Sequence, residues 1–165
     1  DVFISFFKKP NIGIALAFIL SYRLGESQLV KMAAPFLLDK TSAGGLEYST
    51  EAVGTIYGTV GVIMLSLGGI LGGILISKDG LKKWMLPMVL SLNVPNAMYA
   101  ILALTKTTSI VAVVATVVLE QFGYGFGFAA FLIFLIYIAE GISKTSDMVV
   151  FLFGWLLLPY QPFFF

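Results

Sequence analysis

The sequence has 165 residues, of which 59% are hydrophobic and 12% charged, with a formal net charge of +1 and no cysteine or histidine. Soluble domains average roughly 45–50% apolar and about 25% charged residues, so a soluble fold of this size would leave large apolar patches exposed. The composition therefore predicts an all-α membrane protein. The lack of Cys and His excludes a disulfide framework, the common zinc and haem ligand sets and any catalytic triad that needs either residue.

The apolar runs predict about five transmembrane helices. Residues 1–10 are expected to form an amphipathic cytoplasmic lead-in, because Lys8 and Lys9 follow a short apolar patch and no signal-peptide cleavage site comes after them. A spanning helix needs about 20 apolar residues. Residues 11–165 are therefore expected to form a partial transmembrane bundle with spans at 11–38, 50–77, 84–104, 110–139 and 148–165. Since no Met precedes Asp1, we expect the start of a parent protein to be missing.

The first span carries a polar cluster. Arg23 and Glu26 stand at i,i+3 on one helix face, while Gln28 and Lys31 follow within two turns. A charge at mid-bilayer costs at least about 2.5–3.5 kcal/mol, so such residues normally face protein or water. One interpretation is an ion pair that only locks helices together. We favour a substrate or proton site, with Arg23, Gln28 and Lys31 as substrate ligands, because the cluster holds more polar groups than pairing needs.

The second span is expected to begin at an N-cap, Ser49 or Thr50. Small residues recur along it every three or four positions, apart from one gap. They are Gly54, Gly58, Gly61, Gly68 and Gly72. In lipid, such a face lets two backbones approach closely, so it predicts helix packing and no ligand site.

The third and fourth spans contain the remaining polar candidates. Asn96, close to Pro95, is a weaker candidate substrate ligand. Glu120 and Gln121 stand inside the fourth span, where Gln121 is a further candidate substrate ligand. A lone carboxylate at that depth is either protonated or paired with a cation. Glu120 could carry a proton during transport, with Glu26 as the second choice. A static Arg23–Glu120 bridge is an equally weighted alternative.

Basic residues indicate the orientation. One set of loops holds Lys8, Lys9, Lys78, Lys82, Lys83 and Lys144, and the other holds Lys40 and Lys106. The excess of Lys and Arg marks the cytoplasmic side. The N-terminus is therefore expected in the cytoplasm.

The loop 73–83 resembles the cytoplasmic signature of the major facilitator superfamily. The matching positions are Gly73, Lys78, Gly80, Lys82 and Lys83, with Ser77 where an acid is expected. Together with the stretches 22–26, 31–39, 55–61 and 68–73, this loop is similar to the C-terminal half of AmpG-like muropeptide permeases. The resemblance covers about 6–144 and includes Glu120, and the residues after Lys144 depart from it.

This resemblance implies helices seven to eleven of a twelve-helix facilitator in the bacterial inner membrane, with an N-terminal half as the missing partner. It implies proton-coupled import of anhydromuropeptides for peptidoglycan recycling, with Arg23 attracting an anionic group of the solute. Acetyl-CoA transporters share the general pattern and are an alternative. A further alternative is a small membrane subunit that oligomerises through its glycine-rich helix without transport. We expect no enzyme, metal, cofactor or nucleic-acid partner, because no clustered nucleophile, base and ligand set is visible.

Overall fold

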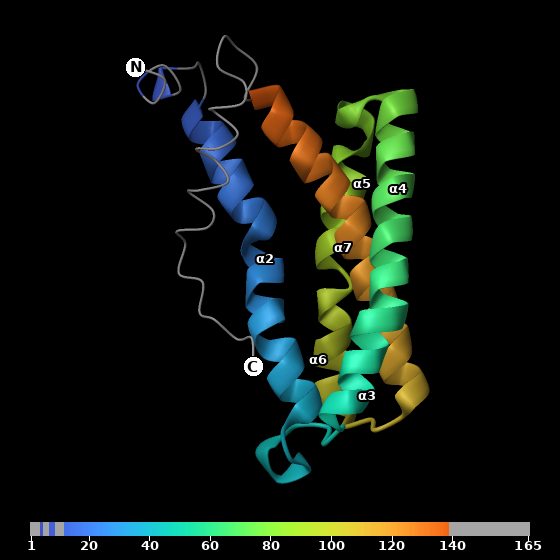
Figure 1. The fold of residues 1–165 in the computed structure, drawn as a ribbon. Coiled ribbons are helices and arrows are strands. Elements are labelled where there is room, and N and C mark those ends of the chain that lie inside the picture. Colours follow the sequence, from blue (N-terminus) through green and yellow to red (C-terminus); the bar gives the residue numbers. More distant parts are fainter. Residues whose placement is uncertain (1–3, 5–6, 9–11, 139–165) are drawn as a thin grey trace.

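The computed structural model describes Ile4, Phe7, Lys8 and residues 12–138 (Figure 1). The predicted fifth span, 148–165, and most of the predicted lead-in, 1–10, lie outside the described residues. The described part is helical, and no strand occurs within it. Its elements are α2 (Ile12–Leu38), η1 (Thr41–Ala43), α3 (Thr50–Thr55), η2 (Ile56–Gly61), α4 (Val62–Asp79), α5 (Leu81–Asn93), α6 (Asn96–Thr105) and α7 (Ile110–Ile138).

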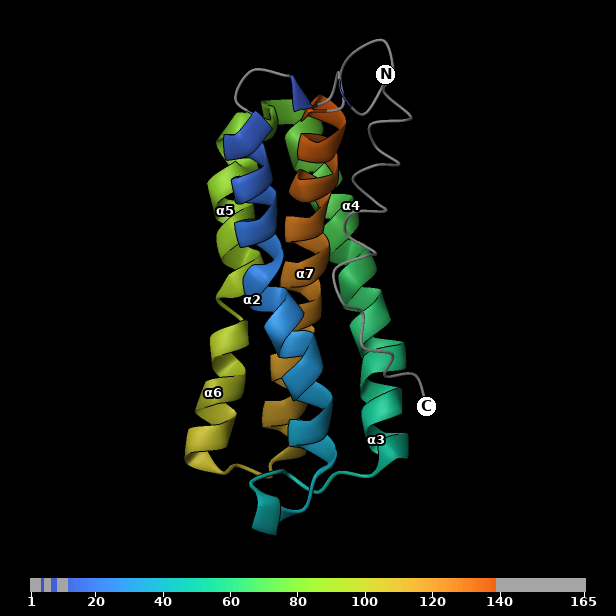
Figure 2. The same cartoon turned by 90° about the vertical axis from the view of Figure 1, so that its left-hand side faces the viewer.

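These elements make four passes that alternate in direction (Figures 1 and 2). The first pass is α2, and α3, η2 and α4 return as one continuous helical stretch. The third pass, α5 and α6, is broken at Pro95, and α7 forms the fourth. Each pass corresponds to one of the first four predicted spans.

Three helical stretches are long and apolar enough to cross a membrane: Thr50–Asp79, Leu81–Thr105 and Ile110–Ile138. Helix α2 is as long as these, but the charged residues Arg23, Glu26 and Lys31 fall within it. The described residues therefore support an all-α membrane protein with three candidate spans. Spans at 11–38 and 148–165 stay predictions.

Two local signals explain where the second pass begins and ends. Ser49 is the N-cap of α3, as the sequence predicts, and its hydroxyl accepts a hydrogen bond from the backbone N–H of Ala52 at 3.1 Å. Gly80 ends α4 and leads into α5 with φ of 85°, a left-handed conformation that glycine adopts without steric cost.

Helix α7 is the centre of the described bundle and packs most extensively against α4 and α5 (Figure 2). Successive glycines of α7 face α5 and α4 in turn. A Cβ on Gly125 would overlap the backbone of Leu65 in α4, whereas one on Gly123 or Gly127 would overlap the backbone of α5. These glycines thus allow close approach of neighbours within an unbroken helix.

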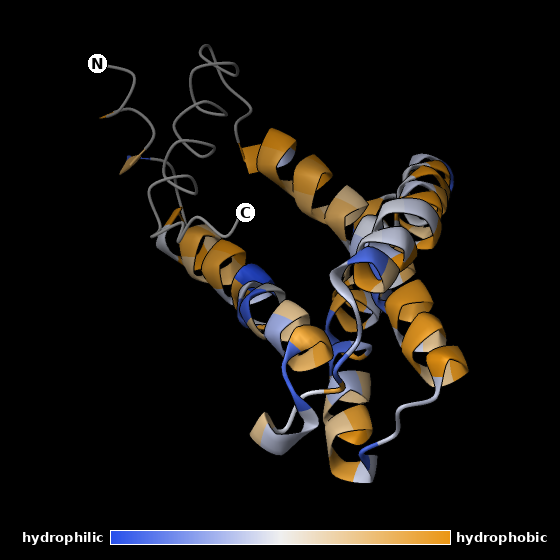
Figure 3. Ribbon diagram, turned by 60° about the horizontal axis from the view of Figure 1, so that its bottom comes forward, coloured by the Kyte–Doolittle hydropathy of each residue, from blue (hydrophilic) through white to orange (hydrophobic). Residues whose placement is uncertain are grey.

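Helix α2 packs less extensively on the rest of the bundle. Its link to α7 includes a buried hydrogen bond from the Tyr22 hydroxyl to the carbonyl oxygen of Gly127 at 2.7 Å. Figure 3 shows mainly hydrophobic colouring along the helices, with hydrophilic residues confined to short stretches. Large apolar side chains such as Leu24, Leu86 and Val111 are exposed, as expected for surfaces that face lipid.

Candidate polar site between α2, α6 and α7

A small, partly open cavity of about 110 Å³ lies where the middle of α2 faces α5, α6 and α7. Glu26 and Leu29 line it from α2, Leu92 and Asn96 from the third pass, and Glu120, Gln121 and Tyr124 from α7. Four of the predicted site residues, Glu26, Asn96, Glu120 and Gln121, therefore surround one space, although they come from three separate passes.

Glu120 is held by two tyrosine hydroxyls and an amide. The Tyr99 hydroxyl donates to Glu120 Oε2 at 2.6 Å and the Tyr57 hydroxyl donates to the same oxygen at 3.1 Å. Gln121 Nε2 donates to Oε1 at 3.1 Å. The two tyrosine hydroxyls also form a hydrogen bond with each other. All of these partners are neutral, so the contacts satisfy the carboxyl oxygens without a cation.

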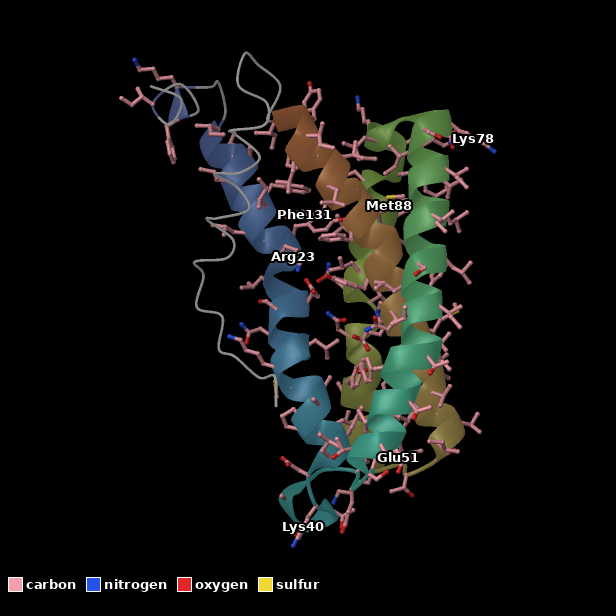
Figure 4. All side chains as sticks on the ribbon, viewed as in Figure 1. Arg23, Lys40, Glu51, Lys78, Met88 and Phe131 are labelled. Carbon is pink, nitrogen blue, oxygen red and sulfur yellow. The ribbon has the colours of Figure 1, made fainter. Side chains whose placement is uncertain are left out.

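Arg23 is paired within its own helix. Its Nε lies 2.9 Å from Glu26 Oε2, and both side chains are only 11% exposed. The guanidinium also lies 5.2–5.6 Å from the ring centres of Tyr124, Phe128 and Phe131, within the range of cation–π attraction. Figure 4 shows Arg23 and Phe131 between α2 and α7. The Arg23–Glu26 pair of α2 therefore faces the protein interior.

The structure differs from the Arg23–Glu120 bridge that the sequence left open. Arg23 forms its ion pair with Glu26, while Glu120 takes its hydrogen bonds from Tyr57, Tyr99 and Gln121. The i,i+3 pair forms because helix geometry alone brings its members together. The partners of Glu120 depend on how η2 and α6 pack against α7.

Gln28 and Lys31 do not reach the cavity in this structure. Both are exposed, and neither is among its lining residues. The physical reason is helical rotation, because consecutive residues are about 100° apart around an α-helix. Gln28 is therefore roughly 200° around α2 from Glu26, and points away from the cavity although it is near in sequence.

Tyr57, Tyr99 and Tyr124 are site residues that the sequence reasoning missed. Tyr57 belongs to η2, a π-helical turn, and π turns occur often at functional sites. Each tyrosine has a hydroxyl that needs a partner inside an apolar helix. The sequence could therefore have indicated that these hydroxyls need hydrogen-bond partners, but only the packing shows which partner each hydroxyl has.

The glycine face is used in part for packing inside the chain. A Cβ on Gly68 would overlap the carbonyl oxygen of Phe122, and one on Gly72 would lie 2.9 Å from the Ala129 Cβ. Gly61 packs against Gln121, whereas Gly54 and Gly58 have open space around them. Gly61, Gly68 and Gly72 therefore lie against α7, and these three contacts are made within one copy of the chain.

The loop motif contains a local cluster around Asp79. Lys83 Nζ lies 3.0 Å from Asp79 Oδ2, and Trp84 Nε1 donates to the same oxygen at 2.8 Å. Lys78, Lys82 and Lys83 are all exposed. Gly73 has open space beside it, and Gly80 has the positive φ described above. The motif therefore forms an exposed, basic turn at one end of the bundle.

Comparisons with known proteins give a distant match over most of the chain. It is 27% identical over 130 residues to the anhydromuropeptide permease of Escherichia coli strain K12, which is 79% of this chain and 25% of that protein. It is 31% identical over 114 residues to the putative transporter AmpG 3 of Rickettsia typhi, which is 68% of this chain and 25% of that protein. The chain is thus similar to a permease and to a putative transporter.

The chain spans about a quarter of the length of the curated relatives it matches. No family model and no solved structure matches it. The similarity to permeases and the apolar helices together indicate a membrane protein related to transporters.

Proposed function

We propose that this chain is part of a secondary transporter of the major facilitator superfamily. The observation that carries the proposal is the convergence of Glu26 and Glu120, from two separate passes, on one small cavity inside an apolar bundle. Ionisable groups at such depth normally mark a substrate or proton pathway. The similarity to permeases supports the same reading.

The solute is proposed to be an anhydromuropeptide imported for peptidoglycan recycling, because one relative is an anhydromuropeptide permease. The protein would lie in the bacterial cytoplasmic membrane with its N-terminus in the cytoplasm. The rest of the pathway would be formed by parts of the transporter beyond this sequence.

Glu120 is proposed to carry the coupling proton. The cavity of about 110 Å³ is too small for a large solute, since pockets for such ligands measure roughly 300–1,000 Å³. It has room for a proton-exchanging carboxyl and a few waters. Arg23 is already paired with Glu26, so its proposed role is to hold α2 against the rings of α7.

Glu120→Gln in the full-length protein carrying this sequence tests the proposal. Gln keeps the size of the side chain but cannot gain or lose a proton at neutral pH. We expect uptake of a labelled anhydromuropeptide into proteoliposomes, driven by an imposed proton gradient, to fall at least tenfold. Binding and membrane insertion are expected to persist.

The matched control is Glu51→Gln, which makes the same change at an exposed position in the first turn of α3. Its uptake should equal that of the unaltered protein. Full gradient-driven uptake by Glu120→Gln would remove Glu120 from the coupling role. No uptake by the unaltered protein, with the gradient verified, would reject the proposed solute.

A further inference from the structure

One carboxyl oxygen of Glu120 and two tyrosine hydroxyls, from three helical elements, lie close together. The hydroxyls of Tyr57 in η2 and Tyr99 in α6 each lie within hydrogen-bond distance of Glu120 Oε2 in α7, and of each other. The other carboxyl oxygen, Oε1, accepts from Gln121. The three oxygens therefore form a closed triangle of contacts.

Counting hydrogens limits how this triangle can be satisfied. Each tyrosine hydroxyl supplies one hydrogen, and an ionised carboxylate supplies none. Two hydrogens can fill only two of the three contacts, which would leave one pair of oxygens facing each other through lone pairs. A third hydrogen on Glu120 Oε2 fills the last contact. In that arrangement the Tyr57 hydroxyl turns its hydrogen from Glu120 Oε2 to Tyr99, and the hydrogens run in one direction, from Glu120 to Tyr57, from Tyr57 to Tyr99 and from Tyr99 back to Glu120.

We propose that Tyr57, Tyr99 and Glu120 form a single proton-binding site, whose loaded form carries the proton on Glu120. The proton sits on Oε2, which leaves Oε1 as the carbonyl oxygen that accepts from Gln121. Tyr57 and Tyr99 are positioning residues, since they hold the proton through Glu120. This site deepens the proposed function and rests on it for its use in transport.

The charged groups nearby agree with a neutral Glu120. Helix α2 faces the cavity with Glu26, which is ion-paired with Arg23, and α7 contributes Tyr124. The groups that contact the Glu120 carboxyl are Tyr57, Tyr99 and Gln121, all neutral. An ionised carboxylate whose contacts are neutral carries a large desolvation cost.

Release of the proton would change the packing of η2. The proton leaves Oε2 for the cavity that Glu120 lines, and one contact of the triangle loses its hydrogen. Tyr57, which belongs to a π-helical turn, is then held by fewer hydrogen bonds to α6 and α7. Proton release therefore loosens the second pass from its neighbours.

Infrared difference spectroscopy tests the loaded state in the purified full-length protein at neutral pH. A protonated carboxyl gives a C=O stretching band that an ionised carboxylate lacks. We expect this band in the unaltered protein and in Glu51→Gln, and its loss in Glu120→Gln. If the unaltered protein instead shows carboxylate bands that disappear in Glu120→Gln, the proposal is overturned.

Tyr57→Phe gives an independent test with a milder change. In the closed triangle, the loss of this hydroxyl removes two hydrogen bonds from the protonated form and one from the ionised form. The protonated-carboxyl band is therefore expected to shrink. If the hydroxyls instead donate separately to a carboxylate, the same variant disfavours the ionised form and the band grows, which would reject the closed triangle.

Tyr48→Phe is the matched control, because the Tyr48 hydroxyl bonds to the Thr108 carbonyl oxygen outside the triangle. Its spectrum should be unchanged. The uptake assay separates the two proposals. If the acid band of Glu120 is present but uptake does not depend on Glu120, the proton site is supported and the coupling role is rejected. If Glu120→Gln loses uptake but the unaltered protein shows no acid band, the coupling role is kept and the proton site is rejected.

Discussion

Arg23 and Glu26 show what a buried ion pair does in this bundle. The pair is almost fully removed from solvent, and the guanidinium lies among the rings of Tyr124 and Phe128. Desolvation of two charges offsets much of their attraction, so the pair by itself adds little net stability. Removing one partner is different, because the other charge then stays buried without compensation.

Single substitutions at this pair should therefore be more harmful than the double substitution. Arg23→Ala and Glu26→Ala are each expected to lower the free energy of unfolding by roughly 3–5 kcal/mol. Arg23→Met combined with Glu26→Leu should cost less than either single change. Thermal unfolding in detergent measures this. Equal stability of the unaltered protein and both single variants would show that the pair is solvated.

At the scale of elements, close approach of α4 and α7 holds the described bundle together. Gly68 and Gly72 on α4 and Gly125 on α7 have no room for a side chain, since each faces the backbone of the other helix. Without a strong hydrophobic force between helices in lipid, this van der Waals packing carries much of their association.

Gly68→Ala is expected to destabilise the protein by about 1–3 kcal/mol, because its methyl group would overlap the carbonyl oxygen of Phe122. Gly54→Ala is the matched control on the same pass, with open space around it. There the higher helix propensity of Ala should leave stability unchanged or raise it by up to about 1 kcal/mol. The melting temperatures of the two variants in detergent check the difference. Equal effects at both positions would contradict packing at Gly68.

The arrangement of the helical elements also explains why Glu120 has tyrosine partners. The third pass breaks at Pro95, where proline cannot donate to the helix, and α6 begins at Asn96 with Tyr99 one turn further on. The second pass contains the π turn that carries Tyr57. Two irregular points in otherwise regular helices thus lie beside the cavity.

At the scale of the whole molecule, the lysines of the loops that the structure describes lie at the two ends in unequal numbers. Lys78, Lys82 and Lys83 lie around the turn between α4 and α5, while Lys40 and Lys106 lie at the opposite end; Figure 4 labels Lys78 and Lys40. Cytoplasmic loops carry the excess of basic residues in membrane proteins. The end with Gly80 is therefore expected to face the cytoplasm.

Single cysteines can test this orientation, because the sequence has no native cysteine. In intact spheroplasts, a membrane-impermeant maleimide should label Thr41→Cys and leave Lys82→Cys unlabelled. Permeabilisation should make Lys82→Cys reactive. Both positions are exposed, so accessibility in the protein itself is matched. The reverse labelling pattern would invert the predicted topology.

The sequence by itself determined the four described helical passes, the all-α membrane class and the cap at Ser49. These properties follow from composition, from the length of apolar runs and from local spacing along one helix. Even the Arg23–Glu26 pair is local, since i,i+3 neighbours share a helix face.

Only the tertiary structure decided which polar residues meet. It placed Glu120 against Tyr57 and Tyr99, brought Asn96 and Gln121 to the cavity, and left Gln28 and Lys31 exposed. Those outcomes depend on how each helix is rotated about its axis and on irregular turns at η2 and Pro95. Rotation is set by packing between passes, which no single stretch of sequence encodes.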